Sequence, residues 1–118
     1  MRYLLLIHQG TTPLPGSPEW EALSAEEQGA VYAAYQEINQ DPRTTPGERM
    51  QPPETATTVR VAEGETLTTD GPFAETKEAL GGYLFVEADD LDGAIEVASK
   101  VPAARMGGAV EVRPLVGE

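Results

Sequence analysis

The sequence predicts one α+β domain, residues 1–118, in which an antiparallel sheet carries two helices on one face. A chain of 118 residues, 40% of them hydrophobic, is long enough to bury a core without disulfides. Two segments have apolar residues at helical spacing, and short apolar or alternating runs of strand length precede and follow each of them. The expected order is strand, helix, strand, strand, strand, helix, strand.

The first strand is expected from Arg2 to Ile7. Its apolar run does not alternate with polar residues and is too short for a helix, which is typical of a strand covered on both faces. The helices of this chain can cover one face, and a second copy is the expected cover for the other. The sequence therefore predicts a homodimer packed sheet to sheet. Residues 9–18, rich in glycine and proline, are expected to form a loop.

Two helix starts follow this loop. Ser17 before Pro18 favours one helical turn, and Ser24 with Glu27 three residues later forms a capping box. The helix that begins at Ser24 is expected to end near Gln40. Its apolar face, at helical spacing, consists of Val31, Ala34, Tyr35 and Ile38.

The middle of the chain is expected to form a long connection and a hairpin. Residues 41–53 contain many prolines and polar side chains, which favours a connection or a lid. Residues 57–61 alternate apolar with polar like a half-buried strand, Glu63-Gly64 can turn the chain, and residues 67–69 form the returning strand. This hairpin can supply an additional edge to the sheet.

The last third of the chain predicts a strand, a helix and a final strand. Residues 83–88 are typical of an internal strand, and Asp89 or Asp90 can cap the helix that Pro102 stops. Val110 to Arg113 alternates as the last strand. Two strand-helix-strand halves with helices on one side of a sheet are typical of a ferredoxin-like domain. The apolar face of the second helix is expected to consist of Leu91, Ala94, Ile95 and Ala98.

The stretch 69–83 gathers turn residues, charged side chains and aromatic residues between two strands. Asp70-Gly71-Pro72 predicts a sharp bend at the end of a strand, because glycine reaches positive φ and proline fixes its own φ. We expect the ligand cleft to be built around this motif. The residues of the stretch that are expected to contact the ligand are Phe73, Glu75, Lys77 and Tyr83.

The segment Asp70-Gly71-Pro72-Phe73-Ala74-Glu75-Thr76-Lys77-Glu78, followed by Leu80-Gly81-Gly82-Tyr83, resembles the signature of the DGPF-domain branch of the YCII-related family. The likeness extends to both ends of the chain. It implies a small, bacterial, cytoplasmic protein with a ferredoxin-like fold that dimerises into an α/β barrel. The biochemical role of that branch is mostly unassigned.

Acid–base chemistry is one of two functions that the sequence leaves open. The resemblance implies that some relatives are lyases with a His-Asp pair, the His lying on the first helix, whereas here that helix contains no His. His8, the only His, stands at the end of the first strand, and Asp70 stands at the bend. These two are the candidate catalytic groups of a cofactor-free lyase or isomerase. The alternatives are a solvated strand end for His8 and an ordinary turn residue for Asp70.

The other function is a small-molecule-binding or regulatory homodimer without chemistry. Arg60 and Arg113 each follow a valine on an alternating strand, so both are expected on the sheet face opposite the helices. There they could bind a small anionic ligand through a carboxylate. The alternative is that they pair with Glu111, Glu75 or Glu78.

Composition excludes several other classes of function. Eight basic and 20 acidic residues give a net charge of −12, which repels nucleic acid. The chain has no Cys and one His, so no metal-ligand spacing is recognisable, and no cofactor motif is present. The first apolar run is too short for a signal peptide or a membrane span, which indicates a cytoplasmic protein.

Overall fold

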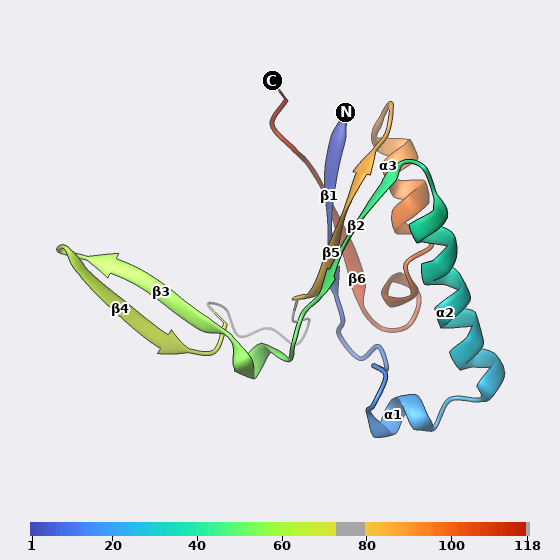
Figure 1. Ribbon diagram of the computed structural model, residues 1–118, viewed down its shortest axis with the longest axis horizontal. Coiled ribbons are helices and arrows are strands. Elements are labelled where there is room, and N and C mark those ends of the chain that lie inside the picture. Colours follow the sequence, from blue (N-terminus) through green and yellow to red (C-terminus); the bar gives the residue numbers. More distant parts are fainter. Residues whose placement is uncertain (73–79, 118) are drawn as a thin grey trace.

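The computed structural model describes residues 1–72 and 80–117. Its main sheet has four strands in the spatial order β2-β5-β1-β6, and each neighbouring pair is antiparallel. Helices α2 and α3 both lie on one side of this sheet (Figure 1). The α+β, ferredoxin-like prediction is therefore confirmed. The bounds are β1 Arg2–His8, α1 Pro18–Glu21, α2 Ala25–Gln40, β2 Thr44–Arg49, β3 Thr57–Ala62, β4 Glu65–Asp70, β5 Leu80–Glu87, α3 Leu91–Ala98 and β6 Ala109–Pro114.

The core lies between the sheet and the two helices. Along β1 every second residue is buried, and Leu5 stands opposite Leu84 of β5 and Val112 of β6. Because directly paired residues of neighbouring strands point to the same side of a sheet, these three side chains form one row toward the helices. The buried core consists of Tyr3, Leu5, Ile7, Ile38, Leu84, Val86, Ala88, Ala94, Val97, Ala98, Val101 and Ala103.

Helix α2 starts as its sequence predicts. The Ser24 Oγ accepts a hydrogen bond from the Glu27 N–H at 3.1 Å, and the Ser24 N–H donates to the Glu27 carboxylate at 3.0 Å. These bonds satisfy two amides of the first turn, and they lower the pKa of Glu27. Of the expected apolar face, Val31 and Ile38 are buried, and Tyr35 packs against the core.

Helix α3 presents a different face to the sheet than expected. Asp90 caps it by accepting a hydrogen bond from the Gly93 N–H at 3.0 Å. Ala94, Val97 and Ala98 are buried, whereas Leu91 and Ile95 are 49% and 47% exposed. The prediction that Leu91 and Ile95 face the core was wrong. Both residue sets have helical spacing, and the smaller set allows the helix to lie closer to the sheet.

The connection expected at residues 41–53 contains the edge strand β2. A proline can lie in an edge strand because no neighbour needs its missing N–H, and Pro46 pairs with Leu84 of β5 on one side only. The pairing with β5 slips between Pro46 and Arg49. At Gly47 an added Cβ would lie 2.1 Å from the Tyr83 carbonyl oxygen, so only glycine fits this approach. The expectation of a connection without a strand was wrong for residues 44–49, because an edge strand tolerates proline and polar residues.

The hairpin β3–β4 does not add an edge to the main sheet. It forms a second, two-stranded sheet that projects to the left of the body in Figure 1. Its turn matches the expectation, with Glu63 and Gly64 at φ of 51° and 79°. Instead of being half buried, Val59 and Val61 are 58% and 69% exposed. The alternation at residues 57–61 correctly predicted a strand. Alternation alone does not indicate which surface, if any, covers the apolar side chains of that strand.

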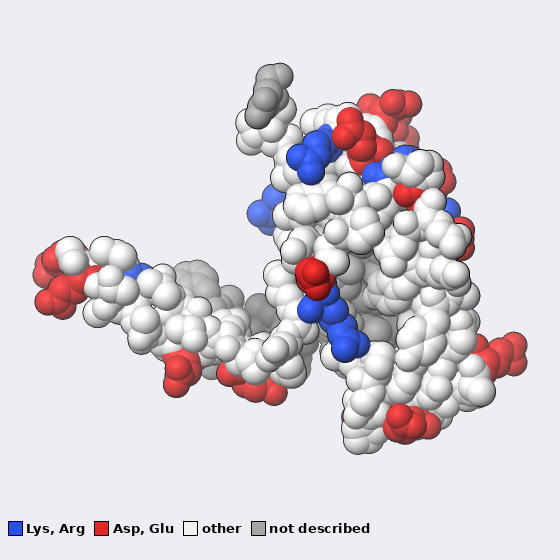
Figure 2. Space-filling view, viewed as in Figure 1, with Lys and Arg blue, Asp and Glu red and all other residues white. Residues whose placement is uncertain are grey.

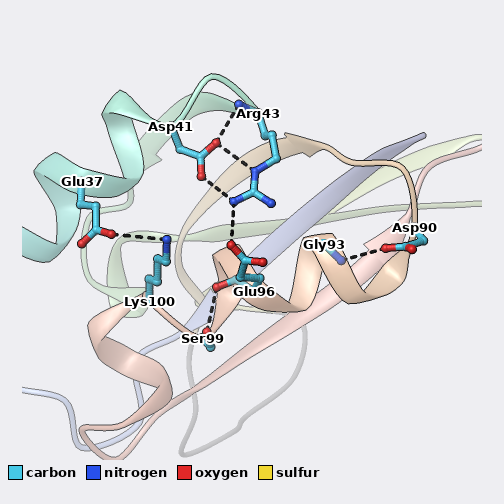
Figure 3. A network of polar contacts seen from close by, with 8 residues as sticks. All are labelled: Glu37, Asp41, Arg43, Asp90, Gly93, Glu96, Ser99 and Lys100. Carbon is cyan, nitrogen blue, oxygen red and sulfur yellow. Dashed lines mark hydrogen bonds and ion pairs between the residues drawn. The ribbon is translucent and has the colours of Figure 1, made fainter.

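Ion pairs join the end of α2 to α3 (Figure 3). The Arg43 guanidinium donates two hydrogen bonds to Asp41, at 2.8 and 3.0 Å, and one to Glu96 at 3.2 Å. Lys100 lies 3.3 Å from the Glu37 carboxylate. The hydrogen bonds from Arg43 lower the pKa of Asp41 to about 2. No helix among the described residues is both long and apolar enough to cross a membrane.

Candidate functional site

A cleft of about 280 Å³ lies between α2 and the main sheet. We call it the α2 cleft. The middle of the face shown in Figure 2 is hollowed beside basic side chains. Six parts of the chain supply the walls: the end of β1, the loop after it, α2, β2, β5 and the segment 102–106. Residues that line it include Gln9, Thr12, Leu14, Val31, Tyr32, Tyr35, Asn39, Arg49, Tyr83 and Met106.

Two groups at the α2 cleft determine its electrostatics. Arg49 comes from the end of β2 and Tyr35 from the third turn of α2. No hydrogen bond or ion pair joins the Arg49 guanidinium to any residue in the described ranges. Burial raises the pKa of the Tyr35 phenol, and the positive charge of Arg49 opposes this rise. At neutral pH the cleft therefore presents one cation and one protonated hydroxyl donor.

Thr12 provides a third polar group. Its Oγ1 is buried and has no hydrogen-bond partner in the described structure, although its N–H donates to the Gln9 carbonyl at 2.9 Å. A buried hydroxyl without a partner costs free energy of folding, and such groups are uncommon in native proteins. Thr12 lines the α2 cleft, and a ligand there would pair with this hydroxyl if the groups that cover Oγ1 moved aside on binding.

A second hollow, of about 500 Å³, adjoins the α2 cleft at Arg49. Gln9, Leu14, Pro15, Arg49 and Gly81 line both cavities. The lining of the second hollow also includes Met50 and Pro52, at the start of the chain's path to the hairpin. Arg49 therefore stands where the two hollows meet and can be reached from either.

The opposite face of the main sheet carries a polar cluster of its own. The His8 Nε2 lies 3.4 Å from the Glu111 Oε1, and the other carboxylate oxygen of Glu111 accepts a hydrogen bond from Arg113. The bond from Arg113 lowers the pKa of Glu111, and His8 adds to this effect. Val110 and Val112 pack against the core, so Arg113 projects away from the helices. The orientation of Arg113, away from the helices, is the one that the alternation of β6 predicts. Of the two partners considered for it, an anionic ligand or a protein carboxylate, it pairs with the carboxylate of Glu111.

The structure separates the residues that the sequence placed in one cleft. Arg60 lies on β3 in the hairpin and Arg113 on β6 in the main sheet, so the shared sheet face expected for them is wrong. Asp70 ends β4 as expected, is exposed and lines neither hollow. The carboxylate that lies beside His8 is that of Glu111 and not, as the sequence suggested, that of Asp70. Tyr83 is one of the residues that line the α2 cleft, although its side chain points to the sheet face away from the helices. Phe73, Glu75 and Lys77 lie outside the described residues.

Sequence reasoning missed Arg49, Tyr35 and Thr12 as members of a site. Arg49 belongs to the segment interpreted as a connection, and Tyr35 was counted only as part of an apolar helix face. One signal was present in the sequence: a tyrosine at the edge of such a face can present its hydroxyl to a cavity. The convergence of a loop, a helix and an edge strand depends on the sheet order, which the sequence does not state.

Comparison with known proteins gives one family and two individual likenesses. The model of the family described as YCII-related domain matches residues 1–117. An uncharacterised protein of Rhizobium meliloti (strain 1021), R00369, is 44% identical over 87 residues, which are 73% of this chain and 68% of that protein. A solved structure of 5-chloro-2-hydroxyhydroquinone dehydrochlorinase from Burkholderia phenoliruptrix AC1100, in complex with 2,5-dihydroxybenzoquinone, aligns at 17% identity and a TM-score of 0.49. That alignment covers 100% of this chain and 96% of the dehydrochlorinase.

Proposed function

We propose that this chain, which belongs to the family of YCII-related domains, binds a small organic anion in the α2 cleft and acts as a homodimer. The observation that carries the proposal is the Arg49 guanidinium, which has no ion-pair partner in the described part of the chain. In a protein of net charge −12 such a cation attracts an anion locally.

The other walls of the cleft indicate the character of the ligand. Val31, Leu14 and Met106 provide apolar surface, whereas Tyr35 and Thr12 provide hydroxyl groups. The volume of about 280 Å³ lies at the small end of ligand cavities. A small ligand with an apolar body and one carboxylate or similarly charged oxygen group fits this combination. The DGPF branch remains a prediction.

The homodimer is supported by the face of the main sheet that no helix of the described ranges covers. We call it the open face. Leu4 and Leu6 of β1 and Tyr83 and Phe85 of β5 point to this side and are only partly buried. A second copy packed on this face would bury them, as the first strand predicts. Sheet-to-sheet packing would also enclose the cluster of His8, Glu111 and Arg113.

Binding can be tested by thermal shift with small aromatic and aliphatic carboxylates and their uncharged primary amides. We expect several carboxylates, but not the matched amides, to raise the Tm of the wild type. Arg49→Met keeps the aliphatic stem and removes the charge, so it should abolish the shift, while Arg49→Lys should keep part of it. Arg105→Met, at an exposed arginine that does not line the cleft, is the matched control and should behave like the wild type. An equal carboxylate shift in Arg49→Met would contradict the proposal.

A cofactor-free lyase or isomerase is the second candidate. It is favoured by the contact of His8 with Glu111, because a carboxylate beside the ring can orient the His for proton transfer. Asp70 remains a predicted acid–base group, but its strand belongs to the other sheet. If a substrate is found, His8→Gln should remove turnover and leave binding in the α2 cleft intact. Unchanged turnover in His8→Gln would exclude this candidate.

A further inference from the structure

Within the described part of the chain, the hairpin β3–β4 packs mainly against itself. Its apolar side chains lie in water, with Val59, Val61 and Leu67 exposed by 58%, 69% and 47%. An isolated two-stranded hairpin is at best marginally stable in water. Val59 and Val61 share one face of the hairpin, whereas Leu67 is paired with Arg60 on the other face. A surface outside the described residues of one chain is therefore needed to cover Val59 and Val61.

The base of the hairpin is nevertheless held in a defined way by the bend at residues 70–72. The Gly71 N–H donates to the Ala56 carbonyl at 2.7 Å, and the Thr58 hydroxyl donates to the Gly71 carbonyl at 2.7 Å. Gly71 has φ of +94°, which side chains other than glycine rarely allow. The Asp70-Gly71 bend thus clamps the two strands where they leave the body.

The size of the chain points to a second copy as the missing surface. A compact protein of this mass exposes about 6,200 Å², whereas this chain exposes 8041 Å². Its radius of gyration is 16.2 Å, against about 13.5 Å for a compact domain of its length. The excess of about 1,800 Å² is comparable to what one subunit buries in an obligate dimer.

The direction of the hairpin fits the same partner. In Figure 1 the hairpin leaves the lower end of the main sheet on the side away from α2 and α3. The hairpin therefore projects on the same side of the main sheet as the open face. Both surfaces carry exposed or half-exposed apolar residues. A second copy packed on the open face would therefore also contact the hairpin.

We propose that β3–β4 is an intersubunit arm that packs Val59 and Val61 against a second copy, with the Asp70-Gly71 bend as its base. The proposal rests on the homodimer of the proposed function. Because a two-fold dimer repeats every contact, each subunit both extends an arm and receives one. The motif at residues 70–71 then sets the direction of the arm, and the ligand cleft does not include it.

The arm can be tested by analytical ultracentrifugation of the full chain. Val59→Ser with Val61→Ser removes apolar surface from both arms, so the dimer dissociation constant should rise at least about 100-fold. Ile95→Ser, at a similarly exposed residue on α3, is the matched control and should leave the constant unchanged. Both variants should keep the far-ultraviolet circular dichroism of the wild type, because these side chains are exposed.

The possible outcomes distinguish a failure of the arm proposal from a failure of the homodimer proposal. A wild type that is monomeric at micromolar concentration would overturn both, and the cover would then be a different protein. If Leu4→Asp dissociates the dimer and the double serine variant does not, the homodimer stands and the arm is wrong.

A spin label gives an independent measurement. The chain has no Cys, so Val61→Cys provides a single labelling site. The nitroxide should be immobilised at concentrations where the dimer forms and mobile after dilution to monomer. A label at Ile95→Cys should move equally in both states. Equal mobility of the residue 61 label in both states would overturn the arm.

Discussion

Thr12 shows at the level of a single residue how the proposed site departs from the rules of stable packing. Its hydroxyl is buried without a partner although the loop around it is well bonded through Thr11 and Thr12 amides. Arg49 and Tyr35 line the same cleft. None of the three could be chosen from the sequence, because threonine, tyrosine and arginine in such positions are individually ordinary.

Thr12→Val should stabilise the protein without ligand and weaken ligand binding. Valine has nearly the same shape and removes the unpaired hydroxyl, so we expect a Tm higher by about 3 °C. The carboxylates that shift the Tm of the wild type should bind this variant several-fold more weakly. Calorimetric scans with and without the carboxylate measure both effects, and a variant that loses stability would show that Oγ1 has a structural partner.

Asp41→Asn should lower stability at neutral pH and have little effect near pH 2. The folded-state pKa of Asp41 is about 2, below its ordinary value of 3.8, mainly because of the hydrogen bonds from Arg43. The ionised group therefore stabilises the fold above pH 4, and this contribution is lost as the pH falls through 2. At pH 7 we expect a Tm lower by about 3 °C. The same difference at pH 7 and pH 2 would contradict the role of the carboxylate charge.

At the level of elements, the parts with local signals were predicted best. The caps at Ser17, Ser24 and Asp90 all form as expected, because a cap needs only its neighbours within a few residues. The edge strand β2 was missed because proline and polar residues at an edge look like a loop. The surface that covers a hairpin depends on the whole fold, so the alternation at residues 57–61 could not reveal the exposure of the arm.

Gly71→Val should disturb the base of the hairpin, whereas Asp70→Asn should leave the fold intact. Valine at φ of +94° is strained by about 2 kcal/mol, while an amide can accept the same local hydrogen bonds as a carboxylate. Amide hydrogen exchange should become faster along β3 and β4 in Gly71→Val only. Equal effects of the two substitutions would show that the Asp70 side chain is itself structural.

At the level of the whole molecule, the two faces of the main sheet separate the two functions considered. The helix side holds the α2 cleft with Arg49, and the open face holds His8, Glu111 and Arg113. The sequence predicted the ferredoxin-like arrangement and the outward direction of Arg113, because the succession of helices and strands along the chain and the alternation within a strand follow from local patterns. It could not predict that Arg60 and Asp70 leave the main sheet with the hairpin, because that depends on which strands pair.

The most direct measurement is the map of amide chemical-shift changes when a carboxylate that raises the Tm is added to ¹⁵N-labelled protein. Binding in the α2 cleft predicts changes at Gln9, Thr12, Tyr35 and Arg49, with little change at Glu111 and Arg113. Loss of these changes in Arg49→Met would complete the result. Changes confined to His8, Glu111 and Arg113 would contradict the account and place the ligand on the open face.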